Sequence, residues 1–136
     1  MLSSTTSSDR PRVLVVDDNE EMLSRASAVL KSGCVIVGAV KDGPTALKAA
    51  LSLRPDVIVL DIGMAGMNGF EVAARLRESG STAEVVFFTV HADEEFIAAA
   101  RAVGGIGYVV KPRLAADLLP AVREAKAHRP FLSAGR

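Results

Sequence analysis

Short apolar runs alternate with longer amphipathic stretches along most of the chain. Each run has four to six residues, is rich in valine and isoleucine, and lacks polar positions. Runs of this kind are typical of strands that are covered on both faces. The sequence therefore predicts five buried strands, at Val13–Val16, Val35–Val40, Val57–Leu60, Val85–Phe88 and Ile106–Val110.

The stretches between these runs place apolar side chains at helical spacing, which predicts five helices that each bury one face. Gly33, Pro55 and Gly80 follow the first three stretches as stop residues. Asn68, with Glu71 three residues later, can cap the third helix. Five strands that alternate with five helices predict an α/β fold, with right-handed crossovers and helices on both faces of a parallel sheet.

Composition narrows the class of protein. The chain has 136 residues, 49% of them hydrophobic, which suits one domain with a core of its own. Sixteen basic and sixteen acidic residues cancel, so net charge gives no reason to expect nucleic-acid or membrane binding by this domain. The single cysteine, Cys34, cannot close an internal disulfide and is expected to fill the core. Residues 1–11 are predicted to be a disordered lead-in rather than a secretory signal, which favours a cytoplasmic location.

Chemistry-bearing side chains follow four of the five predicted strands. The first strand is followed by Asp17 and Asp18, and the third by Asp61. The fourth strand leads into Thr89 and the fifth into Lys111. Parallel strands end at the same edge of a sheet, where ligands bind in this class of fold. We therefore expect three carboxylates, a hydroxyl and an ammonium group to converge there.

Three converging carboxylates need compensation, because two unit charges ~4–5 Å apart repel by roughly 3–4 kcal/mol at an effective dielectric constant of ~20. A raised pKa, the nearby Lys111 or a divalent cation could each relieve the repulsion. Hard oxygen ligands suit Mg²⁺, which keeps several waters and accepts a phosphate as a further ligand. Mg²⁺ is therefore the expected metal.

Four segments follow one another along the chain: Val-Leu-Val-Val-Asp-Asp (13–18), Val-Leu-Asp-Ile-Gly-Met-Ala-Gly-Met-Asn-Gly (59–69), Phe-Phe-Thr (87–89) and Gly-Tyr-Val-Val-Lys-Pro (107–112). In this order they resemble the receiver domain of bacterial two-component response regulators. The match covers essentially residues 12–127 and predicts a receiver domain at residues 12–128. The resemblance implies a flavodoxin-like, doubly wound sheet of five parallel strands in the order 2-1-3-4-5, similar to the chemotaxis regulators.

The resemblance assigns roles to the acidic residues. Asp61 is expected to accept a phosphoryl group from a phosphohistidine, forming an aspartyl phosphate. Asp18, Asp61 and the backbone carbonyl of Gly63 are expected to ligate Mg²⁺, and Asp17 to act through a metal-bound water. Such a protein is a phosphorelay module and is not expected to turn over a separate substrate.

The resemblance also implies a switch. Lys111 and Thr89 are expected to contact phosphoryl oxygens, and Tyr108 to follow Thr89 when it moves. The readout face is then the fourth helix, fifth strand and fifth helix, at roughly residues 92–128, and the Lys111–Pro112 peptide bond is expected to be cis. Val90 stands where a small residue is usual, which predicts slow phosphorylation by small donors such as acetyl phosphate.

Three other functions share part of this pattern. A flavodoxin-type cofactor protein needs a phosphate loop after the first strand, where this chain is acidic. A haloacid-dehalogenase-type phosphatase expects Asp-x-Asp-x-Thr, but Gly63 stands two residues after Asp61. A degenerate receiver that acts only as an adaptor would not need the complete set of acidic, hydroxyl and ammonium groups.

Partners and output follow from the same resemblance. The expected partner is a sensor histidine kinase or phosphotransfer protein that docks on the first helix near Met22–Ala26, and a homodimer could use the readout face. Residues 129–136 are predicted to be a tail or linker remnant, since His128–Ser133 resembles the linker to a helix-turn-helix domain in some transcriptional regulators. The alternative function is thus the receiver part of such a regulator, with its DNA-binding domain outside this chain.

Overall fold

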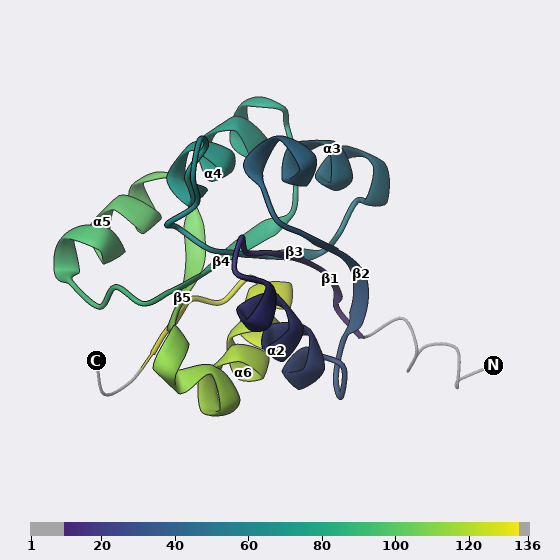
Figure 1. Ribbon diagram of the computed structural model, residues 1–136, viewed down its shortest axis with the longest axis vertical. Helices are drawn as coiled ribbons and strands as arrows, with labels where there is room; N and C mark the ends of the chain where they lie inside the picture. Colours follow the sequence, from purple (N-terminus) through teal and green to yellow (C-terminus); the bar gives the residue numbers. More distant parts are fainter. Residues whose placement is uncertain (1–9, 134–136) are drawn as a thin grey trace.

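The computed structural model describes residues 10–133. Strands and helices alternate along the chain. The strands form one six-stranded parallel sheet, in the order β2-β1-β3-β4-β5-β6. Helices α3, α4 and α5 cover one face of the sheet, and α2 and α6 cover the other (Figure 1). The elements are β1 (Arg12–Val16), α2 (Glu20–Leu30), β2 (Val35–Val40), α3 (Gly43–Leu53), β3 (Val57–Leu60), α4 (Gly69–Glu78), β4 (Glu84–Thr89), α5 (Glu94–Ala102), β5 (Gly105–Val110), a 3₁₀ turn η1 (Lys111–Arg113), α6 (Leu114–Lys126) and β6 (Phe131–Leu132).

The core forms two layers because the central strands bury side chains on both faces of the sheet. Leu14 and Leu60 point into the layer under α3, α4 and α5, whereas Val15 and Val59 point into the layer under α2 and α6. Cys34 is buried in the second layer, and burial raises the pKa of its thiol to about 11. This agrees with the prediction that the cysteine fills the core.

The predicted cap of the third helix is present in full. The Asn68 side chain accepts a hydrogen bond from the Glu71 backbone at 3.0 Å, and the Glu71 carboxylate accepts one from the Asn68 backbone at 2.9 Å. Gly80 ends the same helix with φ at 80°, a conformation that costs glycine little. The cap fixes where α4 begins, shortly after Asp61, and Gly80 follows its end.

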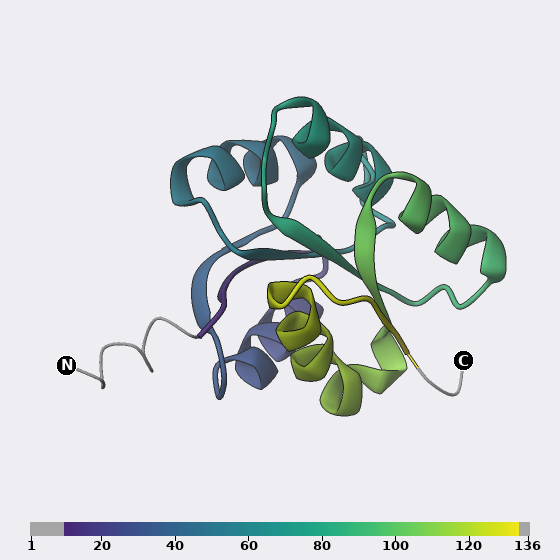
Figure 2. The same ribbon diagram turned by 180° about the vertical axis from the view of Figure 1, so that it is seen from behind.

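The prediction of five strands is wrong by one. Phe131 and Leu132, in the predicted tail, form a sixth strand parallel to β5, between α5 and α6 (Figure 2). A strand of two residues has no periodicity of its own, so its hydrophobic pattern gave no sign of it. At the other end, Pro11 is buried and its carbonyl accepts a hydrogen bond from Val35, although it falls in the predicted lead-in. Residues 1–9 of that lead-in lie outside the described residues.

Candidate functional site

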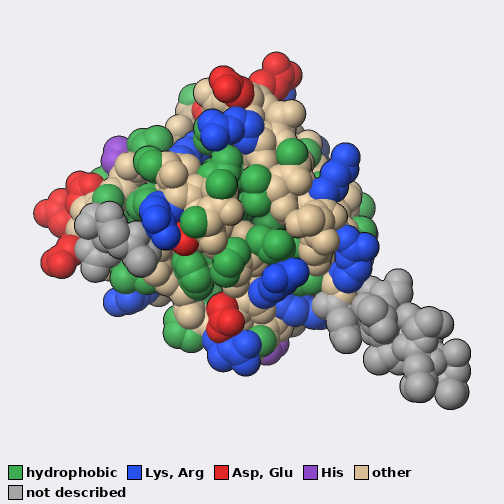
Figure 3. All heavy atoms as spheres, turned by 90° about the horizontal axis from the view of Figure 1, so that it is seen from below, with side chains coloured by type: hydrophobic (Ala, Val, Ile, Leu, Met, Phe, Trp, Pro, Cys, Tyr) green, Lys and Arg blue, Asp and Glu red, His purple; other side chains and the backbone are tan. Residues whose placement is uncertain are grey.

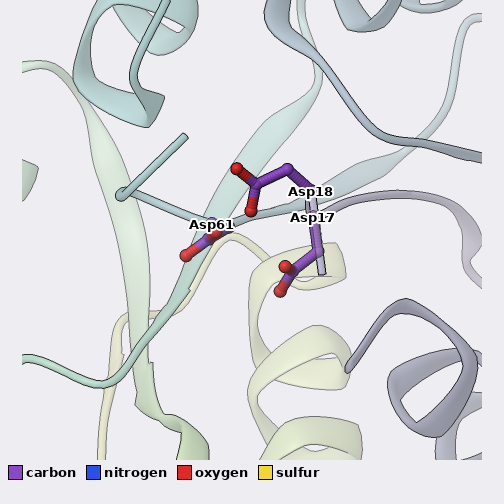
Figure 4. Close-up of side chains that lie close together, drawn as sticks. All are labelled: Asp17, Asp18 and Asp61. Atoms are coloured by element: carbon purple, nitrogen blue, oxygen red, sulfur yellow. The ribbon is translucent and has the colours of Figure 1, made fainter. Parts of the chain in front are cut away.

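Three carboxylates meet at the carboxyl edge of the central strands (Figure 4). Asp17 and Asp18 follow β1 directly, and Asp61 follows the neighbouring strand β3. One oxygen from each residue lies within 4.8 Å of the other two. The structure therefore brings together the three acidic residues that the sequence placed at this edge.

Lys111 lies among these carboxylates at the end of β5. Its Nζ is 2.8 Å from Asp17 Oδ2 and 3.4 Å from Asp61 Oδ1. Its side chain is only 12% exposed and lies over the ring of Phe88, with Nζ 5.4 Å from the ring centroid. A largely desolvated ammonium group thus neutralises part of the negative charge of the site.

Asp17 is completely buried, so its charge needs partners inside the protein. Its Oδ1 accepts a hydrogen bond from the Asn19 backbone at 2.9 Å. Its Oδ2, although close to Lys111, has no hydrogen bond of acceptable geometry. A buried carboxylate oxygen without a hydrogen bond has capacity left for another cationic or hydrogen-bonding group.

Asp61 is buried, with 5% of the residue exposed. Burial raises its pKa, the charge of Asp17 raises it further, and Lys111 opposes both effects. Its backbone is held by close packing against α4: a Cβ at Gly69 would lie 2.3 Å from the Asp61 carbonyl oxygen. Only glycine permits this approach, which explains the glycine at the start of α4.

Thr89 and Tyr108 lie on neighbouring strands and are linked through one residue. Thr89 is buried at the end of β4, and its Oγ1 accepts a hydrogen bond from the His91 backbone at 3.2 Å. The Tyr108 hydroxyl donates to the His91 carbonyl at 2.8 Å. Burial, reinforced by the charge of Asp93, raises the pKa of Tyr108 to about 12, so the hydroxyl keeps its proton at neutral pH.

The expectation of a cis bond before Pro112 is wrong, because no peptide bond within residues 10–133 is cis. Pro112 lies inside the 3₁₀ turn η1, where its fixed φ suits the first turn of a helical segment. The trans form, which X–Pro bonds favour by ≈ 0.5–1 kcal/mol, is accommodated there.

Sequence reasoning missed two residues that support this region. The Asn19 side chain caps α2 by accepting a hydrogen bond from the Met22 backbone at 2.9 Å. The Asn19 backbone N–H donates to the Asp17 carboxylate and so orients it. An asparagine ahead of an amphipathic stretch is a recognisable cap signal. Ser133 is 2% exposed and hydrogen-bonds to β5, but no local pattern marks it.

The donors at this edge fit Mg²⁺. Three carboxylates supply hard oxygen ligands, and Asp17 has a buried oxygen without a hydrogen bond. Gly63, whose carbonyl is the expected backbone ligand, is exposed, and a Cβ there would meet nothing within 4 Å. Among residues 10–133, this is the one cluster of three or more His, Cys, Asp or Glu residues that could hold a metal ion.

Fold and site together define a doubly wound α/β domain with an acidic ligand site where the strands end. Residues 13–123 match the family model described as the response regulator receiver domain. The chain therefore belongs to this family of two-component signalling domains.

Similar proteins agree with this assignment. The positive alginate biosynthesis regulatory protein of Pseudomonas aeruginosa is 40% identical over 121 residues, covering 87% of this chain and 47% of that protein. The nitrate/nitrite response regulator protein NarL of Escherichia coli is 35% identical over 123 residues, covering 89% and 57%. The chain thus spans about half the length of the curated relatives it matches.

Solved structures show the same fold. A two-component response regulator of the LuxR family from Aurantimonas superposes with a TM-score of 0.88 at 26% identity, over 92% of this chain and 91% of that one. The signal receiver domain of the putative response regulator NarL from Mycobacterium tuberculosis superposes with a TM-score of 0.80 at 29% identity, over 88% of this chain and 98% of that one. No helix within residues 10–133 is long and apolar enough to cross a membrane.

Proposed function

We propose that this receiver accepts a phosphoryl group on Asp61 from the phosphohistidine of a histidine kinase or phosphotransfer protein. The observation that carries the proposal is the position of Asp61. One Asp61 oxygen lies within 4.8 Å of an oxygen from each of two other carboxylates, and Asp61 Oδ1 is 3.4 Å from the largely desolvated Lys111 ammonium group, at the edge of the sheet where ligands bind. Membership of the receiver family supports the same role.

In the transfer, an Asp61 carboxylate oxygen attacks the phosphorus atom of the donor. A phosphorus–oxygen bond forms, the phosphorus–nitrogen bond to the histidine breaks, and its electron pair leaves on the imidazole nitrogen. The product is an acyl phosphate on Asp61, and its later hydrolysis by water regenerates the aspartate and releases inorganic phosphate. The protein itself is the acceptor, so it turns over no separate substrate.

Asp18, Asp61 and the Gly63 carbonyl would hold Mg²⁺ directly, and Asp17 would act through a water. Bound Mg²⁺ neutralises negative charge that develops on the phosphoryl oxygens. Asp18 suits direct ligation because it is exposed at this edge, whereas Asp17 is buried against Lys111.

Lys111 and Thr89 are proposed to contact the remaining phosphoryl oxygens. Lys111 is already 3.4 Å from Asp61, so little movement is needed for it to interact with the new group. Thr89 Oγ1 now accepts a hydrogen bond from His91, and it would instead donate its hydroxyl proton to the phosphoryl group. Tyr108, which also hydrogen-bonds to His91, would move when Thr89 moves. The surface formed by α5, β5 and α6 would then differ between the two phosphorylation states.

The kinase is proposed to dock on the outer surface of α2 and α6. Figure 3 shows hydrophobic side chains exposed on this side of the molecule, surrounded by basic and acidic ones. Three half-buried apolar residues, Met22, Val29 and Leu119, belong to this layer. An apolar centre with a charged rim is typical of a protein–protein interface.

The test is incubation with Mg²⁺ and acetyl phosphate, followed by intact mass measurement. The wild type is expected to gain one phosphoryl group, and Asp61→Asn to gain none. Asp42→Asn is the matched control, because Asp42 caps α3, is not part of the acidic cluster, and asparagine caps equally well. Labelling should also disappear when Mg²⁺ is chelated.

Labelling that persists in Asp61→Asn would refute the assignment of the acceptor. Steady hydrolysis of a phosphate ester by the purified protein would instead support the alternative, a phosphatase with an aspartate nucleophile.

A second proposal concerns output. Relatives of this chain include the transcriptional regulatory protein LiaR of Bacillus subtilis and the DNA-binding response regulator MtrA of Mycolicibacterium smegmatis, of which it spans 58% and 50%. We propose that the receiver controls a DNA-binding module of this kind, with homodimerisation through α5, β5 and α6. Codons for a helix-turn-helix after residue 136 of the gene would support this, and a stop codon there would refute it.

A further inference from the structure

The edge of β5 is covered by the chain's own C-terminal segment. Phe131 pairs with Gly107 and Leu132 with Tyr108, in parallel register. Ser133 continues the pairing: its N–H donates to the Tyr108 carbonyl at 2.9 Å, and its Oγ accepts from the Val110 N–H at 3.1 Å. Residues 131–133, named here the edge segment, therefore satisfy backbone groups of β5 that would otherwise face solvent.

A continuous series of hydrogen bonds joins the edge segment to Thr89, the residue that is proposed to contact the phosphoryl group. Thr89 Oγ1 accepts from the His91 N–H at 3.2 Å, and the His91 carbonyl accepts from the Tyr108 hydroxyl at 2.8 Å. The Tyr108 carbonyl in turn accepts from the Ser133 N–H at 2.9 Å. Each residue thus bonds to the next, from the end of β4 to the last described residue of the chain.

The edge segment forms a much shorter strand than β5, which it pairs with. It has two residues in the sheet, Phe131 and Leu132, and both remain partly exposed. A cavity of about 250 Å³ lies between it and α5, lined by Ile97, Arg101 and Tyr108 among others. A short strand beside a gap belongs to the part of a fold that opens most easily.

We propose that β5 is a strand-docking site which the edge segment fills in the unphosphorylated protein, and that phosphorylation of Asp61 releases the segment. This inference rests on the proposed function, since it needs the acyl phosphate. When Thr89 turns toward the phosphoryl group, the His91 N–H loses its acceptor and the loop bonded to Tyr108 moves. Tyr108 then changes its packing against Leu132, which belongs to the same apolar cluster, and the edge segment loses its fit.

Release has a functional consequence at the readout face. The edge segment lies between α5 and α6, alongside β5, the strand that carries Tyr108 (Figure 2). While it is docked, no other strand can pair with this edge of β5. Its departure exposes the backbone groups of this edge and frees residues 131–133 to move.

The experiment is hydrogen exchange, followed by NMR, with Mg²⁺ and beryllium fluoride, which takes the place of a phosphoryl group on an aspartate. The amides of Ser133 and Val110 are the probes, and each is expected to exchange about fivefold faster or more in the adduct, as for loss of one net hydrogen bond. The Glu84 amide, bonded to the Asp56 carbonyl at the opposite end of the sheet, should not change. Asp61→Asn should show no response.

Variants separate docking from the switch. Ser133→Ala removes the acceptor of the Val110 amide, so that amide should exchange quickly even without beryllium fluoride. Ser32→Ala, at an exposed serine away from β5, should leave the response intact. Tyr108→Phe removes the bond to His91, so the adduct should still form while the response of Ser133 is reduced.

The two proposals fail in different ways. An adduct that forms on Asp61 without faster exchange at Ser133 and Val110 overturns the release of the edge segment and leaves the phosphoacceptor role standing. If no adduct forms at all, the proposed function fails, and the inference fails with it.

Discussion

Replacement of Lys111 by methionine tests whether the ammonium group stabilises the acidic site. Methionine keeps a long, unbranched side chain near Phe88 but removes the charge. Asp17, fully buried, would then lose its one cationic partner within the described residues. We expect the variant to be less stable without Mg²⁺ and to recover part of the loss when Mg²⁺ is added.

The expected magnitude follows from the distances. At an effective dielectric constant of about 20, charges 2.8 and 3.4 Å apart attract by about 6 and about 5 kcal/mol. Most of this is offset by the cost of desolvating the ammonium group, and loss of one partner of a buried pair typically costs about 3–5 kcal/mol. We expect a value near the lower end, about 3 kcal/mol, because Asp18 at the same site is exposed to solvent.

The assay is urea unfolding of both proteins, with a chelator and then with saturating Mg²⁺. Lys126→Met is the control, since Lys126 pairs with Asp56 at 3.4 Å on the surface, where such a pair contributes about 0–1 kcal/mol. If Lys111→Met loses no more stability than this control, Lys111 does not compensate the buried charge and the electrostatic account of the site is wrong. A loss that Mg²⁺ does not reduce at all would contradict metal binding at these carboxylates.

Three further predictions concern the surroundings of the site. Gly69→Ala is expected to lower the free energy of unfolding by about 1–3 kcal/mol, since its Cβ would overlap the Asp61 carbonyl, whereas Gly63→Ala should change it little in the same urea assay. The hydrogen bond from Arg113 lowers the pKa of Asp117, so the wild type should be more stable than Asp117→Asn at pH 7. That advantage should be lost as the pH falls below the ordinary aspartate pKa of 3.8 and through the lowered pKa of the folded protein. Urea unfolding of both proteins at a series of pH values measures it, and a constant difference across this range would contradict the prediction. Val90→Ala should speed phosphorylation by acetyl phosphate, by no more than about tenfold, and equal rates for the two proteins would show that the exposed Val90 does not obstruct the donor.

The pattern of the sequence was sufficient to predict the central sheet and the position of the acidic residues. Strands buried on both faces have no polar positions, so their ends are visible as the first polar residues, Asp17, Asp61 and Lys111. Capping signals such as Asn68 with Glu71 likewise act between residues close in sequence. Interactions of this kind are local, and local interactions can be read from spacing alone.

Other features depend on contacts between residues distant in sequence. The sixth strand exists because β5 offers unpaired backbone groups to Phe131 and Leu132, and nothing within those two residues encodes this. The bond before Pro112 is trans, whereas resemblance to the family, and not local physics, implied a cis bond.

Strand length and chain order are enough to predict which groups reach the edge of the sheet, because they set where each strand ends. How the charges of these groups are shared depends on the packed fold. It buries Asp17 fully, leaves Asp18 exposed, and places Lys111 closer to Asp17 than to Asp61. Burial and distance set the strength of charge–charge interactions, and both arise only when strands far apart in the chain are packed side by side.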